Sequence, residues 1–440
     1  MLKPNRRILT AIAEPIGVNT EKLFQQLTGI VGQGNLDQSA DTIGLIDSST
    51  SALAAVSPGS TAEVVAIIKA AEAEGVALIP CGGGTEIQTG YPPAGDRPYL
   101  LLRSARMDKI TDFQPDDLTA TVEPGVTLAA LQQHVASRRL FLALDVPKAE
   151  QATLGGIVSS ATSGFWRPSY GAPRDLVIGL KAIMTGGVEV KGGGKVVKNV
   201  AGYDICKLFT GARGTLGFLT ELTFKLRPLP EADRTLAWNA PDLEEAVRLG
   251  LELHHAQLAS TFLVATNEPE GVPRLVVGLQ GVSARVDWQV NEFSRRVSAA
   301  RWNSLPNIMP PSELAALRDR LAPFEATGTF ASRIAMLPSQ LSAFVAALAD
   351  LPQIRATVHC ASGIVSLSAN DVTSDTVRRV KTLLPKDANV VWTRLDAALA
   401  EQEKIALFGE TRAEFGLQQA LKKALDLRNT FSPGRFLGKL

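Results

Sequence analysis

A glycine-rich loop at residues 81–85 is the segment of this sequence best suited to bind a ligand. It reads CGGGT, and its glycines permit positive φ angles and leave no Cβ in the path of a bound group. Successive backbone N–H groups of such a loop can form a nest for an anion such as a diphosphate. The spacing is neither that of a Walker loop nor that of a Rossmann fingerprint. A surface turn is the alternative, but the apolar strand expected before the loop and Gly90 at its end favour the nest.

Two further glycine segments lie at or just before the starts of expected helices. Residues 153–156 (TLGG) stand at a helix start, where N–H groups and the helix dipole favour a phosphate or an electron-rich carbonyl. Close packing of the helix would explain the same glycines. Residues 123–126 (EPGV) lie between a strand and a helix, and a structural turn explains them fully.

A polar loop then runs from residue 161 to about 175, which is longer than a simple connection requires. Long loops in compact domains are usually functional or disordered. This one contains Ser163-Gly164, Tyr170-Gly171 and Arg174. The guanidinium of Arg174 either supplies a positive charge to a ligand or pairs with a carboxylate such as Asp175.

Histidine and cysteine are too scarce and too scattered to predict a metal site. The pair His254-His255 lies on an expected helix face, where solvated or packed side chains are a better interpretation than metal ligands. His359 ends an expected strand, where it either packs in the core or faces a substrate. The three cysteines are far apart and lack metal-ligand or iron–sulfur spacing.

Local patterns indicate the elements that position these segments. Ser60 and Glu63 form a predicted capping box for a helix that runs through Ala73 and ends at Gly75. A short buried strand at 76–79 leads directly into the glycine loop. Further strands are expected at 100–102, 119–123, 176–184 and 219–226, and further helices near 20–27 and at 127–137.

The pattern changes after Pro230. Helical segments at 242–255, 312–321, 339–348 and 374–383 alternate with strands at 275–279, 354–359 and 390–392. We therefore predict an α+β protein with more than one domain, which a chain of 440 residues can form. The predicted parts are an N-terminal extension (1–47), a first domain (48–230), a second domain (231–425) and a C-terminal segment (426–440).

Composition excludes several classes of protein. The formal net charge of +1 gives no electrostatic reason to expect nucleic acid as a partner. No apolar run approaches the length of a membrane span, and no apolar core follows the basic residues near the amino terminus, as it would in a secretory signal. The separated cysteines are those of a reduced, cytoplasmic protein.

Two longer strings, KNVAGYD (198–204) and GARGTLGFLTE (211–221), give the glycine loop a family context. Together they resemble the flavin-binding domain of the vanillyl-alcohol oxidase superfamily, and within it the FAD-binding E subunits of bacterial glycolate oxidase. The resemblance covers residues 48–230, where the order of all motifs agrees; the second domain matches only in size and broad pattern. It implies a PCMH-type FAD-binding domain of two α+β subdomains, an α+β cap domain and a C-terminal segment that returns to the FAD domain.

The resemblance also assigns roles within the first domain. It implies that the glycine loop wraps the FAD pyrophosphate, that residues 153–156 lie beside the diphosphate and the flavin ring, and that residues 217–219 bond the adenine through their backbone. A covalently linked flavin in this superfamily often uses a His near the first glycine loop; Thr85 stands in that region, so FAD is expected to bind non-covalently. The implied FAD-binding residues are Cys81, Gly82, Gly83, Gly84, Thr85, Glu86, Pro124, Gly125, Thr153, Leu154, Gly155, Gly156, Ser163, Gly164, Tyr170, Gly171, Gly217, Phe218 and Leu219.

The implied activity is oxidation of glycolate, or a similar small 2-hydroxy acid, to the 2-oxo acid by hydride transfer to the flavin. Arg174 or His359 would be catalytic, binding the substrate carboxylate or taking the hydroxyl proton. Electrons would leave through partners, namely a homologous FAD-containing catalytic subunit and an iron–sulfur subunit of the glycolate oxidase complex. The expected location is the cytoplasm, or the inner face of the membrane reached through those partners.

Two alternatives remain open. The His-rich metal motif that catalytic relatives often carry in the second domain is missing from this sequence, which favours an accessory role. The chain would then be an electron-transfer or structural subunit whose flavin does not meet substrate. A dehydrogenase for a different 2-hydroxy acid is also compatible with the motifs, because fold does not fix function.

Overall fold

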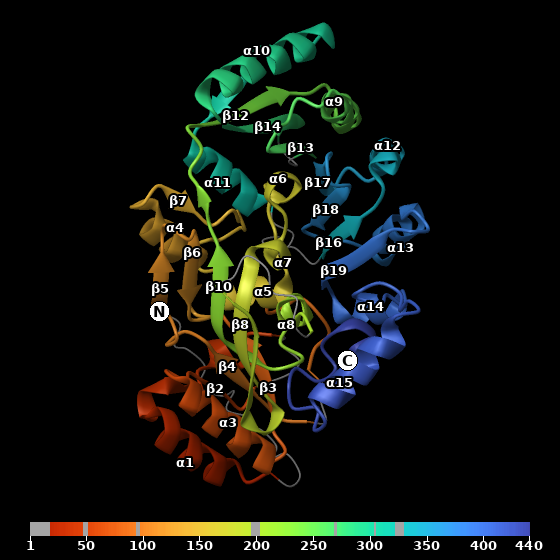
Figure 1. Ribbon diagram of the computed structural model, residues 1–440. Helices are drawn as coiled ribbons and strands as arrows, with labels where there is room; N and C mark the ends of the chain where they lie inside the picture. Colours follow the sequence, from red (N-terminus) through yellow and green to blue (C-terminus); the bar gives the residue numbers. More distant parts are fainter. Residues whose placement is uncertain are drawn as a thin grey trace, which may run out of the picture.

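The computed structural model describes residues 18–46, 52–93, 97–194, 203–267, 271–302, 305–321 and 330–440. Residues 198–202 of the KNVAGYD string, and residues 1–17 and 47 of the predicted N-terminal extension, lie outside the described residues. The described chain forms two neighbouring α/β layers, a larger sheet beyond them, and a C-terminal segment that runs back to the first layer (Figure 1). The predicted α+β architecture is confirmed.

The first layer is a four-stranded sheet in the order β1-β2-β4-β3. Strands β2, β4 and β3 are parallel, and the short β1 is antiparallel to β2. Helix α3 begins as the capping box predicted, because Ser60 Oγ accepts from Glu63 N at 3.2 Å; Glu63 reaches one residue further back, to Gly59 N at 2.8 Å. The bounds are α1 (Thr20–Val31), β1 (Leu36–Asp37), α2 (Ala40–Ile43), β2 (Ala54–Val56), α3 (Thr61–Ala73), β3 (Ala77–Cys81) and β4 (Tyr99–Arg103).

The second layer is a five-stranded antiparallel sheet in the order β5-β6-β10-β8-β9. Strands β8 and β9 form a hairpin, and Gly186 and Gly187 have φ angles of +72° and +76° at its turn. The strands are β5 (Ile110–Gln114), β6 (Thr119–Val122), β7 (Leu140–Phe141), β8 (Val177–Met184), β9 (Val188–Gly193), β10 (Phe218–Lys225) and β11 (Arg227–Pro228). The helices are α4 (Leu128–Ala136), α5 (Leu154–Ser160), α6 (Arg167–Tyr170), α7 (Pro173–Leu176) and α8 (Ile205–Phe209).

After Pro230 the chain builds one eight-stranded antiparallel sheet in the order β15-β12-β14-β13-β17-β18-β16-β19. Its apolar side chains pack with helices α9, α10 and α12 in one large core. The strands are β12 (Ala232–Asn239), β13 (Phe262–Asn267), β14 (Arg274–Gly281), β15 (Asn307–Met309), β16 (Phe330–Ala335), β17 (Arg355–His359), β18 (Ile364–Ala369) and β19 (Asn389–Leu395). The helices are α9 (Leu243–His255), α10 (Ser283–Ala299), α11 (Pro311–Arg320), α12 (Leu341–Leu348), α13 (Ser374–Leu383) and α14 (Ala397–Gln402).

The C-terminal segment packs against the first layer after helix α15 (Phe415–Leu425), which Figure 1 draws in blue. Leu78 N donates to Thr430 O at 2.8 Å, so the tail runs beside β3, the strand that precedes the glycine loop. Buried Lys422 Nζ lies 2.6 Å from Asp426 Oδ2 and fixes the turn between α15 and the tail. None of the helices in the described part of the chain is both long and apolar enough to cross a membrane.

Candidate functional site

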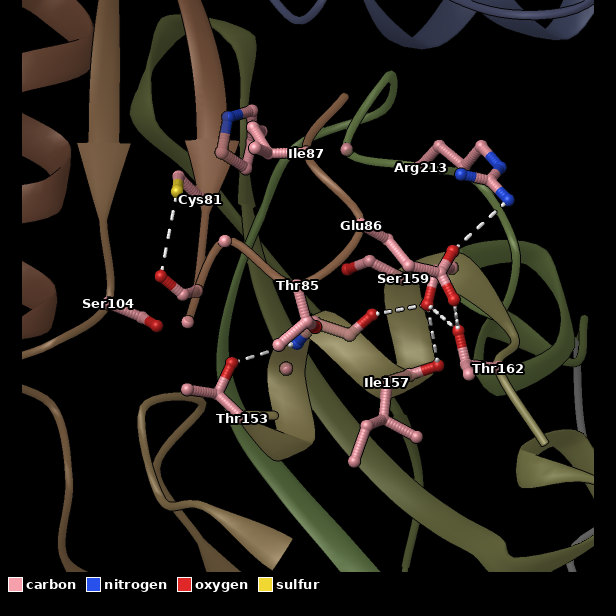
Figure 2. Close-up of a pocket in the computed structure, with 18 of the residues that line it drawn as sticks. Cys81, Thr85, Glu86, Ile87, Ser104, Thr153, Ile157, Ser159, Thr162 and Arg213 are labelled. Carbon is pink, nitrogen blue, oxygen red and sulfur yellow. Dashed lines mark hydrogen bonds and ion pairs between the residues drawn. The ribbon is translucent and has the colours of Figure 1, made fainter. Parts of the chain in front are cut away.

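A cavity of about 1040 Å³ lies where β3 and the glycine loop meet helix α5 and the start of β10. Figure 2 shows side chains from these separate segments converging on it. The C-terminal tail closes one side through Arg435, whose guanidinium Nη2 donates to Ile87 O at 2.6 Å. The cavity therefore depends on four stretches of chain that are distant in sequence.

The three glycines of the loop meet two different requirements. Only Gly84 has a positive φ, of +77°. A Cβ on Gly82 would lie 2.0 Å from Thr153 Oγ1, and one on Gly83 would lie 1.8 Å from Gln151 O. Gly82 and Gly83 thus allow the loop to lie directly against the segment that starts helix α5, while Gly84 makes the turn.

The loop offers free hydrogen-bond donors to the cavity. Within the described residues, the backbone N–H groups of Gly83, Gly84, Thr85 and Glu86 donate to no protein acceptor. Four successive donors without an acceptor are what an anion nest requires.

The start of helix α5 differs from the expectation. Gly155 N donates to Pro124 O at 2.9 Å, and Gly156 N donates to the side chain of Thr153 at 3.3 Å. These N–H groups fix the turn and the helix start, and so the glycines there serve close packing. The N–H groups of Gly155 and Gly156 therefore already have acceptors within the protein.

Glu86 lies at the centre of a buried polar network beside the loop. Its carboxylate accepts from the hydroxyl of Thr162 and lies 3.5 Å from Arg213 Nη2. The two ionised side chains are 14% and 13% exposed. Burial lowers the pKa of the Arg213 guanidinium, and the charge of Glu86 acts in the opposite direction. Figure 2 draws this network at the edge of the cavity.

A second cavity, of about 700 Å³, adjoins the first across that network, because Glu86, Pro147, Thr162 and Arg213 line both. Its remaining walls come from the loop at 163–165, from helix α11 and from strands of the eight-stranded sheet. Those walls contribute Ser163, Gly164, Phe165, Arg318, Leu321, Arg333, Thr357, His359, Ile364, Ser366 and Thr393. Three arginines therefore face one cavity, which makes it attractive to an anion.

His359, which lines this second cavity, and Asp145, which holds one of its wall segments, have shifted pKa values. Burial, with the nearby charges of Arg167 and Arg333, lowers the pKa of His359 to about 4, so its imidazole is neutral at pH 7. Burial raises the pKa of Asp145 to about 7, against the opposing effects of Arg318 and of two backbone N–H donors. Asp145 accepts those hydrogen bonds from Phe165 N and Trp166 N, and so anchors the loop that walls the cavity.

Most residues singled out in the sequence lie at the two cavities. The first is lined by Cys81, Gly82, Gly83, Gly84, Thr85, Glu86, Pro124, Thr153, Gly155, Gly156, Gly217, Phe218 and Leu219. The second is lined by Ser163, Gly164 and His359. Gly125, Leu154, Tyr170, Gly171 and Arg174 line neither cavity.

The residues outside the cavities have other surroundings. Gly125 approaches Ser104 O so closely that a Cβ would lie 2.1 Å away, and Leu154 is fully buried. Tyr170 donates from its hydroxyl to Gln280 at 2.8 Å and joins helix α6 to the eight-stranded sheet. Arg174 is exposed.

Sequence patterns did not single out Arg213, Arg318, Arg333 or Arg435 for this site. Arg213 lies inside the GARGTLGFLTE string, and that string was the one available signal. The other three arginines reach the cavities through packing of distant elements, and no local pattern marks them. Among the described residues, no group of three or more His, Cys, Asp or Glu side chains could hold a metal ion.

Comparison with known proteins places the first cavity in an FAD-binding domain. Residues 52–193 match the FAD binding domain family model. Glycolate oxidase subunit GlcD of Bacillus subtilis is 33% identical over 216 residues, covering 49% of this chain and 46% of the relative. D-2-hydroxyglutarate dehydrogenase of Stutzerimonas stutzeri is 34% identical, covering 43% and 41%, and glycolate oxidase subunit GlcE of Escherichia coli is 35% identical, covering 36% and 45%. The matched part thus spans less than half the length of these relatives.

Solved structures extend the similarity of fold to nearly the whole chain. An alkyldihydroxyacetonephosphate synthase aligns with a TM-score of 0.71 at 16% identity, over 94% of this chain and 84% of that one. A p-cresol methylhydroxylase with substrate bound aligns with a TM-score of 0.69 at 17% identity, over 94% and 96%. The described chain therefore has the PCMH-type fold, an FAD-binding domain followed by a second α+β domain.

The first cavity fits FAD on its own features. Four free N–H groups suit the pyrophosphate, and its walls also hold two buried hydroxyls, Ser104 Oγ and Thr89 Oγ1, that have no hydrogen-bond partner among the described residues. Buried polar atoms without a partner are costly, so a bound group that supplies one is favoured. FAD is the cofactor of this domain.

Proposed function

We propose that this chain is an FAD-dependent dehydrogenase subunit that oxidises glycolate or another small 2-hydroxy acid to the 2-oxo acid. The observation that carries the proposal is the wall shared by the FAD cavity and the arginine-lined cavity. A carboxylate substrate held in the second cavity would lie next to the cofactor held in the first. Relatives named as glycolate oxidase subunits and as D-2-hydroxyglutarate dehydrogenase support this class of substrate.

The glycine loop and the start of β10 would hold FAD non-covalently, with the pyrophosphate on the N–H groups of residues 83–86. Backbone groups of residues 217–219 remain our proposal for the adenine. When bound, FAD supplies the acceptor for the hydride that leaves the substrate Cα. The tail residues Arg435 and Phe436 close this cavity, so we expect an intact C-terminal segment to be needed for cofactor retention.

His359 would take the proton of the substrate hydroxyl. Its imidazole is neutral at pH 7 and lines the second cavity, so it can accept that proton. The positive charge of Arg333 opposes protonation of His359 in the free protein. A substrate carboxylate beside Arg333 would offset that charge and raise the pKa of the imidazole when the proton is transferred. The exposed Arg174 is less well placed for either catalytic role.

Anaerobic mixing of the FAD-loaded chain with a panel of 2-hydroxy acids tests the activity. We expect loss of the oxidised-flavin absorbance with one or more members, and a slower loss in the His359→Gln variant. If a 2-hydroxy acid reduces the flavin of the His359→Gln variant as fast as that of the unchanged chain, His359 does not take part in the reaction. If no 2-hydroxy acid reduces the flavin, alone or with partner subunits, the proposed activity is wrong.

A second candidate function is favoured by the names of two relatives. GlcD and GlcE are both designated subunits, and GlcE in particular matches this chain over 160 residues. The chain would then act beside a homologous FAD-containing catalytic subunit and an iron–sulfur subunit, in the cytoplasm or at the inner face of the membrane through those partners. In that role its own flavin would carry electrons, or stabilise the assembly, without meeting substrate.

A further inference from the structure

Two arginines of the second cavity have guanidinium groups whose positive charge is not neutralised by a close ion pair within the described residues. Arg333, on β16, is half-buried, and its guanidinium takes part in no ion pair or hydrogen bond with the described residues. Arg318, on helix α11, is 15% exposed, and its Nε is buried without a hydrogen-bond partner in the described structure. The third arginine, Arg213, already pairs with Glu86.

Asp145 offsets the charge of Arg318 incompletely. Asp145 Oδ2 lies 4.0 Å from Arg318 Nη1, at the limit for an ion pair, and the same carboxylate already accepts two backbone N–H groups. Burial raises the pKa of Asp145 to about 7, so a substantial fraction is uncharged at neutral pH. Arg318 therefore retains both charge and donors for a ligand.

The two guanidiniums enter the cavity from different elements, and His359 lies on the Arg333 side. Arg333 and His359 belong to the same sheet, on β16 and β17, where Arg333 pairs with Ser366 of β18 and Ser366 pairs with Thr357, two residues before His359. Arg318 comes from helix α11, together with Leu321. Thr393 Oγ1 lines the cavity as well and is buried without a partner among the described residues. The cavity thus has two cationic positions that are not on one element.

We propose that the second cavity is built for a 2-hydroxy acid with a second carboxylate, held by Arg333 at the carboxylate next to the hydroxyl and by Arg318 at the distal one. This inference rests on the proposed function and narrows its substrate class from small 2-hydroxy acids to 2-hydroxydicarboxylates. Two partly desolvated cations, Arg333 without an ion pair among the described residues and Arg318 only weakly paired with Asp145, bind two carboxylates well because each charged hydrogen bond is stronger away from water. A monocarboxylate such as glycolate would leave Arg318 without a ligand carboxylate.

Binding of acids that cannot be oxidised tests this without turnover. Glutarate and valerate have the same five-carbon chain and differ by one carboxylate. Each is titrated into the FAD-loaded chain, and binding is followed by the change in the visible flavin spectrum and by the shift in Tm. We expect glutarate to bind on the order of 100-fold more tightly than valerate. Equal affinities would overturn the proposal.

Matched variants test whether both arginines are needed. Arg318→Gln and Arg333→Gln should each bring the affinity for glutarate close to that for valerate, with unchanged FAD content. Arg355→Gln removes an arginine from the same sheet that lines neither cavity, and it should keep the glutarate preference. A preference for glutarate that survives in both cavity variants would refute the assignment.

The two proposals can fail separately. Preferential glutarate binding in a chain whose flavin no 2-hydroxy acid reduces would refute the proposed activity and support the dicarboxylate site. Reduction of the flavin by glycolate and lactate, with no binding of glutarate, would support the activity and refute the dicarboxylate site.

Discussion

The guanidinium of Arg213 lies 3.5 Å from the carboxylate of Glu86, and both side chains line the wall between the two cavities. Arg213 also lies over the ring of Phe408, with its Cζ 5.3 Å from the centroid. The FAD domain supplies Glu86 and Arg213, whereas Phe408 belongs to the core of the second domain. This ion pair therefore sits where both domains meet the cofactor cavity and the proposed substrate cavity.

Breaking this pair should destabilise the protein. In Glu86→Gln the buried Arg213 loses its counter-charge, and the cost of leaving one member of a buried pair is on the order of 3 kcal/mol. Chemical denaturation of the FAD-free chain measures the free energy of unfolding. The double variant Glu86→Gln/Arg213→Met should recover much of the loss, because no unpaired charge remains. A double variant as unstable as the sum of both single variants would contradict the coupling.

The close approach of the glycine loop predicts a loss of cofactor in Gly83→Val. A Cβ at residue 83 would lie 1.8 Å from Gln151 O, so the loop must move and its N–H groups with it. We expect FAD content to fall to a small fraction of the unchanged chain, measured by the ratio of flavin to protein absorbance. Gly416→Val is the control, because a Cβ there meets no atom within 4 Å. Full FAD occupancy in folded Gly83→Val would remove the loop from the cofactor site.

Most of the residues singled out for the first cavity could be predicted from the sequence because the patterns that mark them are local. A strand followed at once by CGGGT, and a turn followed by TLGG, are short patterns whose backbone requirements can be read directly. Even there, positive φ explains only Gly84, because the contacts that require Gly82 and Gly83 come from residues 151 and 153. Those contacts exist only after the chain has folded.

The second cavity could not be predicted from local patterns. Arg213, Arg318 and Arg333 are spread over more than a hundred residues and three kinds of element, and each by itself is compatible with an exposed surface arginine. They meet because the loop at 163–165 packs against the eight-stranded sheet, whose strand order departs from sequence order. The exposed Arg174, singled out by its place in the family pattern, lies away from that packing.

The buried carboxyl of Asp145 predicts a specific pH dependence of stability. Its folded pKa, about 7, is above the value near 3.8 of an unperturbed Asp, so the folded state holds its proton more strongly than the unfolded state. The protonated carboxyl of Asp145 therefore contributes stability that is fully present below pH 4 and is lost as the pH rises to about 7. The loss in unfolding free energy is up to about 4 kcal/mol, because each unit of pKa difference corresponds to about 1.36 kcal/mol. Asp145→Asn cannot ionise and lacks this loss.

The difference in unfolding free energy between Asp145→Asn and the unchanged chain isolates this group. His359 titrates in the same range with the opposite sign, because its lowered pKa costs stability as pH falls from 6.5 towards 4. Both proteins contain His359, so its contribution cancels in the difference. Relative to the unchanged chain, the variant should gain stability between pH 4 and pH 7. A difference that does not change with pH would show that Asp145 is ionised normally.

We predict that acid precipitation releases the flavin into solution. Thr85 stands in the region of the glycine loop where a linking histidine is found in covalent relatives, and a hydroxyl is a poor nucleophile. Cys81 also lines the cavity, but burial raises the pKa of its thiol, so the reactive thiolate is scarce at neutral pH. Absorbance of the supernatant and of the pellet after precipitation measures the split. Colour that remains with the pelleted protein would show a covalent link.

The last prediction concerns partners. The three cysteines are buried, are separated in the chain and have no iron–sulfur spacing, so this chain offers no cluster ligands of its own to carry electrons onward from its flavin. Two relatives are named as subunits of glycolate oxidase. If the chain has the accessory role of the second candidate function, we expect a stable complex with a homologous flavoprotein subunit and an iron–sulfur subunit, and weak or no 2-hydroxy-acid dehydrogenase activity from the chain alone.

Reconstitution from separately purified subunits measures this directly. Turnover with an artificial electron acceptor should rise several-fold when the partners are added, and omission of this chain should abolish the activity of the assembly. Gly83→Val separates two roles for the chain within the complex. If it assembles normally but turnover is lost, the flavin of this chain carries electrons or meets substrate; if turnover is retained, its role is structural. Full turnover by the isolated chain, unchanged on adding partners, would rule out the accessory-subunit view.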